Sequence, residues 1–443
     1  MENFPSPESR GEQKVDFGEL VDLANSADVT VYERLNASND KQAKAEFLEN
    51  PELVHPNNQY GNLDETEVRR NFTTLEQIDE ELENSDLNDK RKRLIRLVTD
   101  DYKKKNEFLA ANIAYNVAET PEEKAQAAEW HKQANEALYG KADESTFYTL
   151  LKEKIDSIDV DSLSEEDRKT YDWLMNEIGP LPEKTGGRFK PKQETVERFA
   201  ELTNHFFEDF LKHVPEGKTE FSSEEMVKII NEIADNEFGG MDIKYRAVID
   251  PSVSNASTNH EERLLKFPEG TKYTEKRLKA LIVHEFGTHM LRALPYLDSE
   301  VKVFASGLPG NETFDEGIAK CVEQAIDGKY ADSGIDHYIN IGLATFKGKN
   351  FREVYNIQMA LKQLTGEKTD TVLNAVQRCF RGTGELVNNK DLAYYNGANQ
   401  VWKYIEEHLD DPELFDNLFL TGKANINNPT QEALSYEMRM GGL

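Results

Sequence analysis

The sequence predicts an α+β fold that is predominantly helical and contains a small β-sheet. Through most of the 443 residues, apolar side chains recur at the three- and four-residue spacing of amphipathic helices. Residues 241–250 and 262–270 are different, because they are short, rich in β-branched, aliphatic and aromatic side chains, and separated by a polar stretch. This pattern is typical of strands. We therefore expect a small sheet packed beside a helical body.

The N-terminal segment, residues 1–60, is polar and interrupted by prolines. We expect it to be partly mobile, with residues 15–25 forming a short docked helix.

We expect the next region, residues 61–180, to be acidic and helical. Residues 88–119 keep helical apolar spacing. A second helix is expected between Thr120, a typical N-cap residue, and Gly140, which follows its last turn. Residues 144–156 predict a third helix.

The last region, residues 181–443, follows a linker rich in Pro and Gly at residues 177–192. Helical patterns at residues 194–214 and 222–240 precede the two predicted strands, and helices resume at Thr274.

The composition excludes several classes of partner. The chain has 83 acidic and 53 basic residues, a net charge of -30, which repels nucleic acid and anionic lipid. The N-terminus lacks the pattern of a signal peptide, and no apolar run reaches the roughly 18 residues of a membrane helix. Cys321 and Cys379 alone provide no disulfide framework. We expect a cytoplasmic protein without nucleic-acid or membrane partners, and the composition predicts no oligomeric state.

The stretch VHEFGTHMLR, residues 283–292, is the strongest candidate for chemistry. The apolar stripe of its predicted helix extends onto Glu285 and His289, and His284 lies about one turn beyond Leu281. Burying an unpaired carboxylate and two imidazoles is costly unless something compensates their polarity. A divalent cation would do so, and we therefore predict a metal site.

The spacing of the two histidines demands an unusual helix. In the common zinc helix the second His follows the first by four residues, but here Thr288 holds that position. Residues four apart differ by about 40° around an ideal helix and residues five apart by about 140°. His284 and His289 can share a metal only if the helix widens, as in a π-bulge. We predict a distorted turn at residues 286–289, with Gly287 absorbing the change.

Two alternatives stay open from the residues alone. In a chain with nine histidines, these two can be unrelated. The third ligand is also undetermined, because the helix predicted within residues 309–324 offers four acids: Glu312, Asp315, Glu316 and Glu323. Thr313 and Glu316 match a capping box, which would use Glu316 at its own helix terminus.

Together, the segments HEFGTH, GLPGNETFDEGIA and CFRGTGELVNNKDLAYYNG resemble the tyrosine carboxypeptidase-like zinc metallopeptidases, a family that includes bacterial relatives with a QEGLA motif. ALYGKADESTFYTLL is similar to the Leu-Tyr-Gly region of the family. The resemblance covers about residues 85 to 440 and implies a zincin-like catalytic domain within residues 181–443. Where the family commonly has Gln or Glu before its ligand Glu, this chain has Asp315.

The resemblance implies a zinc ion held by His284, His289 and Glu316. Three protein ligands leave a position open for water, as catalytic zinc requires. Glu285 would then be the general base that removes a proton from the attacking water and passes it to the leaving amine.

The resemblance also implies substrate-binding roles for Arg381, Lys390 and Tyr394. An arginine fork suits a terminal carboxylate, so Arg381 is the first candidate, and Tyr394 is a candidate oxyanion donor. Residues 262–270 or their partner strand would offer a sheet edge to an extended peptide.

The expected function is a zinc carboxypeptidase acting on the C-terminus of a peptide or protein. Two alternatives are a zinc amidohydrolase acting on another amide, and a non-catalytic helical binding module with structural zinc. One member of the family acts on the acidic tail of tubulin. A net charge of -30 argues against that substrate for this chain.

Overall fold

The structure is a computed structural model that describes residues 16–183, 185–238, 245–251, 253, 256–259 and 262–440. The predicted fold class is confirmed, because many helices surround two small sheets. Part of the strand predicted at residues 241–250 lies outside the described residues.

Helices fill the first half of the chain, including the segment 16–60 that we expected to be polar and partly mobile. Their bounds are α1 (Phe17–Asn25), α2 (Val31–Arg34), α3 (Asp40–Glu49), α4 (Glu65–Asn84), α5 (Asp89–Val117), α6 (Pro121–Tyr139), α7 (Glu144–Asp156), η2 (Val160–Ser162) and α8 (Glu165–Ile178).

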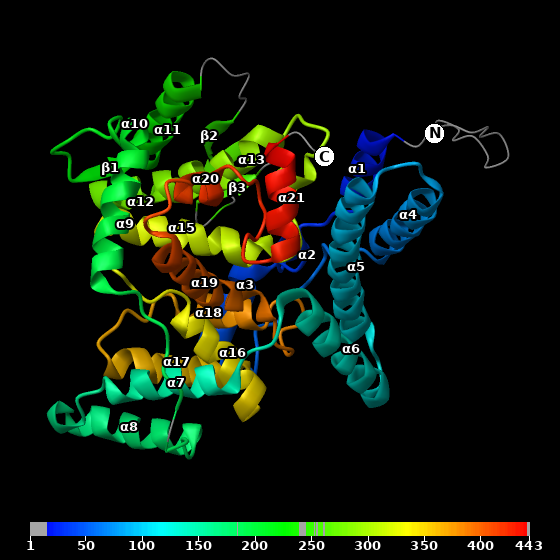
Figure 1. Ribbon diagram of the computed structural model, residues 1–443. Helices are drawn as coiled ribbons and strands as arrows, with labels where there is room; N and C mark the ends of the chain where they lie inside the picture. The colour runs from blue at the N-terminus through cyan, green and yellow to red at the C-terminus, as the bar shows by residue number, and fades with distance from the viewer. Residues whose placement is uncertain are drawn as a thin grey trace.

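Local sequence signals set several of these boundaries. Thr120 caps α6 within a complete capping box, and Gly140 ends that helix at a φ of 80°, as the sequence predicts. The predicted third helix coincides with α7. The predicted docked helix is α1, whose buried Phe17 and Leu20 pack with α4 and α5. Figure 1 shows the long α5 along one side of the body, with α4 and α6 against it.

The second half begins after the predicted linker, since α8 ends at Ile178 and α9 starts at Gln193. Its helices are α9 (Gln193–Phe206), α10 (Glu208–Leu211), α11 (Ser223–Phe238), α12 (Glu275–Leu281), η3 (Ile282–Met290), α13 (Leu291–Ala293), η4 (Leu294–Tyr296), α14 (Val303–Ser306), α15 (Asn311–Asp327), α16 (Ile335–Lys347), α17 (Phe351–Leu364), α18 (Val372–Cys379), η5 (Asn389–Asp391), α19 (Leu392–His408), α20 (Leu414–Phe419) and α21 (Pro429–Arg439).

The sheets are small and lie beside α11 and α12. β1 (Glu220–Ser222) pairs with β5 (Lys272–Thr274) in antiparallel fashion. In the three-stranded sheet, β4 (Leu264–Phe267) lies between β2 (Arg246–Ile249), which is parallel to it, and β3 (Ser257–Asn259), which is antiparallel.

The order of the three-stranded sheet corrects the sequence analysis in two respects. The polar stretch between the predicted strands contains β3, because its backbone pairs with β4 despite its polar side chains. Of the two candidates for a sheet edge, residues 262–270 are excluded because β4 has a partner on each side, whereas its partner strands β2 and β3 form the edges.

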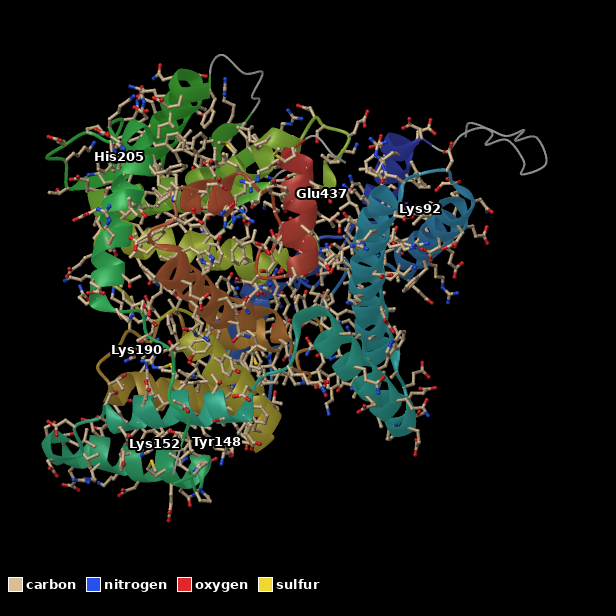
Figure 2. The ribbon with its side chains drawn as sticks, viewed as in Figure 1. Lys92, Tyr148, Lys152, Lys190, His205 and Glu437 are labelled. Atoms are coloured by element: carbon tan, nitrogen blue, oxygen red, sulfur yellow. The ribbon has the colours of Figure 1, made fainter. Side chains whose placement is uncertain are left out.

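The crossing of α15 and α19 lies near the middle of the molecule (Figure 1). A buried cluster that includes Phe199, Phe314, Val401 and Trp402 surrounds this crossing. Polar side chains such as Lys190 and His205 are exposed at the surface (Figure 2). In the described part of the chain, no helix has the length and apolarity needed to cross a membrane.

Candidate metal centre

The segment with the two candidate histidines is a π-helix. The sequence predicts a distorted turn at residues 286–289, and the structure confirms the widening but extends it over all of η3. A π-helix joins residues five apart by its backbone hydrogen bonds, so it brings His284 and His289 close to one face. Their ring centroids are 5.1 Å apart. Thr288 Oγ1 donates a hydrogen bond to the Val283 carbonyl oxygen five residues earlier, at 2.8 Å.

Gly287 has a steric role at this turn. A Cβ atom at this position would lie 2.6 Å from Cε1 of Phe207, whose ring packs against the π-helix. Its φ is outside the left-handed region, so its conformational freedom is not what the fold requires. The absence of a side chain allows η3 to approach the loop between α9 and α10.

Glu316 comes from the neighbouring helix α15. This helix begins at Asn311 without a side-chain cap, so Glu316 lies inside it and the capping-box alternative is wrong. Donor atoms of His284, His289 and Glu316 all lie within 4.8 Å of one another. Two imidazoles and one carboxylate in this arrangement could hold a metal ion.

Two glycines fix the position of α15 against α19. A Cβ on Gly317 would lie 2.4 Å from the Gly397 carbonyl oxygen, and a Cβ on Gly397 would lie 1.9 Å from the Thr313 carbonyl oxygen. The backbones of the two helices therefore touch. This contact brings Tyr394 of α19 close to Glu316, whose charge is the main cause of the raised pKa of the tyrosine.

Asp315 holds the ring of His289 through its Nδ1 atom. Its Oδ2 lies 2.6 Å from His289 Nδ1, and its Oδ1 lies 2.8 Å from Nε of the fully buried Arg292. Burial opposes the charge of Asp315, but Lys423, His289 and Arg292 hold its pKa well below the usual range. Burial likewise opposes a proton on His289, but Asp315 raises the histidine pKa.

Glu323 has the same relation to His284. Its Oε2 lies 3.4 Å from His284 Nδ1, and the carboxylate also pairs with Arg277 and Lys320. Burial alone would raise its pKa, but His284 and Lys320 lower it. Because both histidines direct Nδ1 at a carboxylate, both Nε2 atoms can bind a metal.

Glu285 lies next to this group, with 8% of its surface exposed. Its Oε2 accepts a hydrogen bond of 2.9 Å from Thr258 Oγ1 on the edge strand β3, and its Oε1 is 4.0 Å from His284 Nε2. The sheet therefore orients a carboxylate that belongs to the same helix as the two histidines.

A cavity of about 1330 Å³, hereafter the metal cavity, is lined by the three candidate ligands, Glu285, Lys390 and Tyr394. Lys390 forms an ion pair of 2.9 Å with Glu312. Arg381 does not line the metal cavity. It lines an adjoining cavity of about 1130 Å³ that shares Asp332, Gly334, His337 and Arg378 with it.

Sequence reasoning missed several residues of the site. Arg378 lies at the junction of the two cavities and donates a hydrogen bond of 2.9 Å to the Tyr394 hydroxyl. In the sequence, its position three residues before Arg381 could have indicated a second arginine at the site. The wall formed by Tyr32, Lys105 and Tyr139 comes from α2, α5 and α6, and nothing in the local sequence indicates that it reaches the metal cavity.

The α5 and α6 helices also hold the loop that carries Arg381 and Lys390. Asn116 donates a hydrogen bond of 2.7 Å to the Gly382 carbonyl oxygen, and Asn135 donates one of 3.0 Å to the Val387 carbonyl oxygen. Gly382 has a φ of 98°, and a Cβ there would lie 2.3 Å from Asn112 Oδ1.

A family model described as microtubule-associated tyrosine carboxypeptidase matches residues 184–436, which is more than half of the chain. The match confirms the resemblance seen in the sequence. No curated protein and no solved structure matches the chain.

Proposed function

The chain belongs to the microtubule-associated tyrosine carboxypeptidase family, and from this premise we propose that it is a zinc peptidase that removes a C-terminal residue from a peptide or protein. The family supports a carboxypeptidase-like enzyme. The observation that supports zinc is the convergence of His284, His289 and Glu316 within 4.8 Å, beside Glu285.

The three proposed ligands fit a catalytic zinc ion. Two imidazoles and one carboxylate form a known donor set for such an ion, which needs one coordination position left open. Among the described residues, no fourth His, Cys, Asp or Glu joins the group, which favours an open site over a closed structural one. When bound, zinc would supply Lewis-acid chemistry that polarises the scissile carbonyl and acidifies water.

Glu285 is the proposed general base. It takes a proton from the attacking water on a carboxylate oxygen and returns that proton to the leaving amine. The hydrogen bond from Thr258 to Oε2 fixes the orientation of the carboxylate and leaves Oε1 for this proton transfer.

Arg381 and Tyr394 are the proposed substrate-binding residues, as the resemblance implies. Arg378 is already occupied by two bonds of 2.7 Å to Asp391, whereas no ion pair engages Arg381 within the described ranges. Arg381 is therefore the better fork for a terminal carboxylate. The Tyr394 hydroxyl accepts from Arg378, so its own proton can be donated to a developing oxyanion. Lys390 would bind through its ammonium, in exchange with Glu312.

The peptide chain has a proposed docking edge at β3. This strand ends the three-stranded sheet and carries Thr258 beside Glu285. An extended substrate could add to β3 by main-chain hydrogen bonds and so carry its last peptide bond past the metal.

Metal analysis with matched variants tests this proposal. We expect about one zinc per chain in the wild type and in Glu312→Ala, which removes an acid of the same helix outside the ligand group. Glu316→Ala and His289→Ala should lose zinc. Zinc retained in Glu316→Ala would contradict the ligand assignment.

Activity provides the second test. Glu285→Gln should keep zinc but lose about 10²- to 10⁴-fold in kcat on a peptide with a free C-terminus, because the general base is gone. Unchanged activity in this variant would refute the role of Glu285. A peptide with an amidated C-terminus should not compete, because it lacks the carboxylate that Arg381 would bind.

A further inference from the structure

The segment 380–391, which joins α18 to α19, carries Arg381 near its start and Lys390 near its end. These are two of the three proposed substrate-binding residues. The Asn388 amide donates a hydrogen bond of 2.7 Å to the Cys379 carbonyl oxygen, so the segment forms a loop whose two ends meet. The conformation of this one segment, hereafter the 380–391 loop, therefore sets the positions of both cations.

Asn135 of α6 holds the second half of the loop. Its Nδ2 donates a hydrogen bond of 3.0 Å to the Val387 carbonyl oxygen, and its Oδ1 accepts one of 2.9 Å from the Asn389 amide. In return, Asn389 Nδ2 donates a bond of 2.8 Å to the Gly140 carbonyl oxygen, where α6 ends. Asn135 is 3% exposed, so water does not replace these bonds when they are lost. Three hydrogen bonds thus join the end of α6 to the residues just before Lys390.

The long helix α5 holds the first half of the loop. Asn116 Nδ2 donates a hydrogen bond of 2.7 Å to the carbonyl oxygen of Gly382, the residue that follows Arg381. One residue earlier in α5, the Tyr115 hydroxyl donates a bond of 2.7 Å to Glu385 Oε2. The main chain next to Arg381 is therefore fixed to a helix that lies more than 250 residues away in the sequence.

The bonds of Asn135 also bear on Tyr394. Asn389 begins η5, and Asp391 ends it two residues later. Asp391 accepts two bonds of 2.7 Å from Arg378, whose guanidinium donates one of 2.9 Å to the Tyr394 hydroxyl. A displacement of Asn389 would move Asp391 with it, because both belong to one helical turn. Through Arg378 it would also change the direction of the Tyr394 hydroxyl.

From these contacts we propose that Asn116 and Asn135 are positioning residues, through which α5 and α6 place Arg381 and Lys390 for the substrate. The inference rests on the proposed function and makes helices outside the matched residues 184–436 part of the site. In the described part of the chain, both asparagines lie outside the lining of the two cavities. They therefore act through the loop and not by touching the substrate.

Kinetics of Asn135→Ala test the proposal. We expect kcat/KM on a peptide with a free C-terminus to fall about 10- to 100-fold, because a small misplacement of substrate-binding groups has an effect of this size. Zinc content should equal that of the wild type, since the proposed ligands belong to η3 and α15. A kcat/KM within about threefold of wild type would overturn the role of Asn135.

The matched control is His131→Ala. It also truncates a buried side chain of α6, but the His131 ring packs on Phe108 of α5, at 5.0 Å between centroids. This variant should keep kcat/KM within about threefold of wild type. If it loses as much activity as Asn135→Ala, general loss of packing in α6 explains both variants and the proposal is wrong.

A double-mutant cycle with Asn116 distinguishes positioning from a merely structural role. Asn116 is exposed, so its replacement by Ala leaves no buried group of its own unpaired. Asn116→Ala alone should raise KM about tenfold. In the Arg381→Ala background it should change KM less than about twofold, because the group that it positions is gone. Losses that multiply in the double variant would mean that Asn116 does not act through Arg381.

Two measurements without turnover separate this inference from the proposed function. Peptide binding to zinc-loaded Glu285→Gln, followed by fluorescence anisotropy, should weaken about tenfold when Asn116→Ala or Asn135→Ala is added. Hydrogen exchange in the 380–391 loop should be faster in Asn135→Ala than in wild type or His131→Ala. If the wild type cleaves no peptide but both results hold, the proposed reaction fails and the positioning role stands. If cleavage occurs while exchange and binding stay at wild-type values in these variants, the positioning role fails and the reaction stands.

Discussion

Replacing Asp315 by Asn removes one buried charge while keeping the shape of the side chain. The carboxylate lies 2.8 Å from Arg292 Nε, 3.3 Å from Lys423 Nζ and 2.6 Å from His289 Nδ1. Arg292 has no exposed surface. Without the aspartate charge it would keep bonds to backbone carbonyls, such as that of 2.9 Å to Ala424, but no anion.

The magnitude follows from these contacts. A unit pair at about 4 Å contributes about 4 kcal/mol at an effective dielectric constant near 20, and breaking a buried pair by removing one partner costs about 3–5 kcal/mol. We therefore expect Asp315→Asn to lower the free energy of unfolding of the metal-free protein by about 3–5 kcal/mol. Urea unfolding followed by circular dichroism measures this change.

The same substitution should also weaken the metal site. Asp315 fixes the ring of His289 through Nδ1, and removing such a partner typically lowers metal affinity about 10- to 100-fold. Competition with a chromophoric chelator measures the affinity for zinc. The control is Asp336→Asn, because Asp336 pairs with Lys362 at 2.6 Å but lies outside the candidate ligand group.

The two readouts can refute the reasoning separately. A loss of less than about 1 kcal/mol would mean that Arg292 needs no buried anion, contrary to the electrostatic argument. If the variant loses stability as expected but keeps the zinc affinity of the wild type, Asp315 does not position His289. The control should retain wild-type zinc affinity in either case.

Three further predictions concern packing, pH and metal removal. Gly317→Ala should lower the free energy of unfolding by about 3 kcal/mol or more, because its Cβ would meet the Gly397 backbone at 2.4 Å; urea unfolding equal to wild type would refute this contact. Burial lowers the pKa of His131 to about 4, so the unfolded state binds a proton on this histidine more tightly than the folded state does. The folded protein therefore loses stability as the pH falls from about 6.5 toward 4. This loss should reach about 2 kcal/mol between pH 7.5 and 5, and it should disappear in His131→Gln but persist in the exposed control His205→Gln. Chelation should lower the melting temperature of the zinc-loaded wild type but not that of Glu316→Ala, because only a bound metal stabilises the folded state by mass action; an equal shift in both would contradict the site.

Local signals predicted those parts of the fold that depend on neighbouring residues. The bounds of α6 and α7 follow from caps and helical spacing within their own segments. Thr274 caps α12 by accepting a hydrogen bond of 3.2 Å from the Arg277 amide. Strand β3 was not predicted, because its polar side chains carry no alternating pattern and its backbone pairing with β4 defines it.

In the candidate site, too, some features follow from local sequence and others depend on contacts between distant segments. Two histidines five residues apart can share a metal only on a widened helix, so the metal hypothesis predicted a distorted turn, and the structure extends this turn over all of η3. The sequence by itself could not choose among the acids of α15, because spacing gives each of them a plausible partner. The packing of α15 against η3 and α19 places Glu316 beside the imidazoles and Asp315 and Glu323 at the Nδ1 atoms. Contacts between segments hundreds of residues apart bring Tyr32, Lys105 and Tyr139 to the wall of the metal cavity. Such contacts also place Arg381 in the adjoining cavity, and no local sequence pattern encodes them.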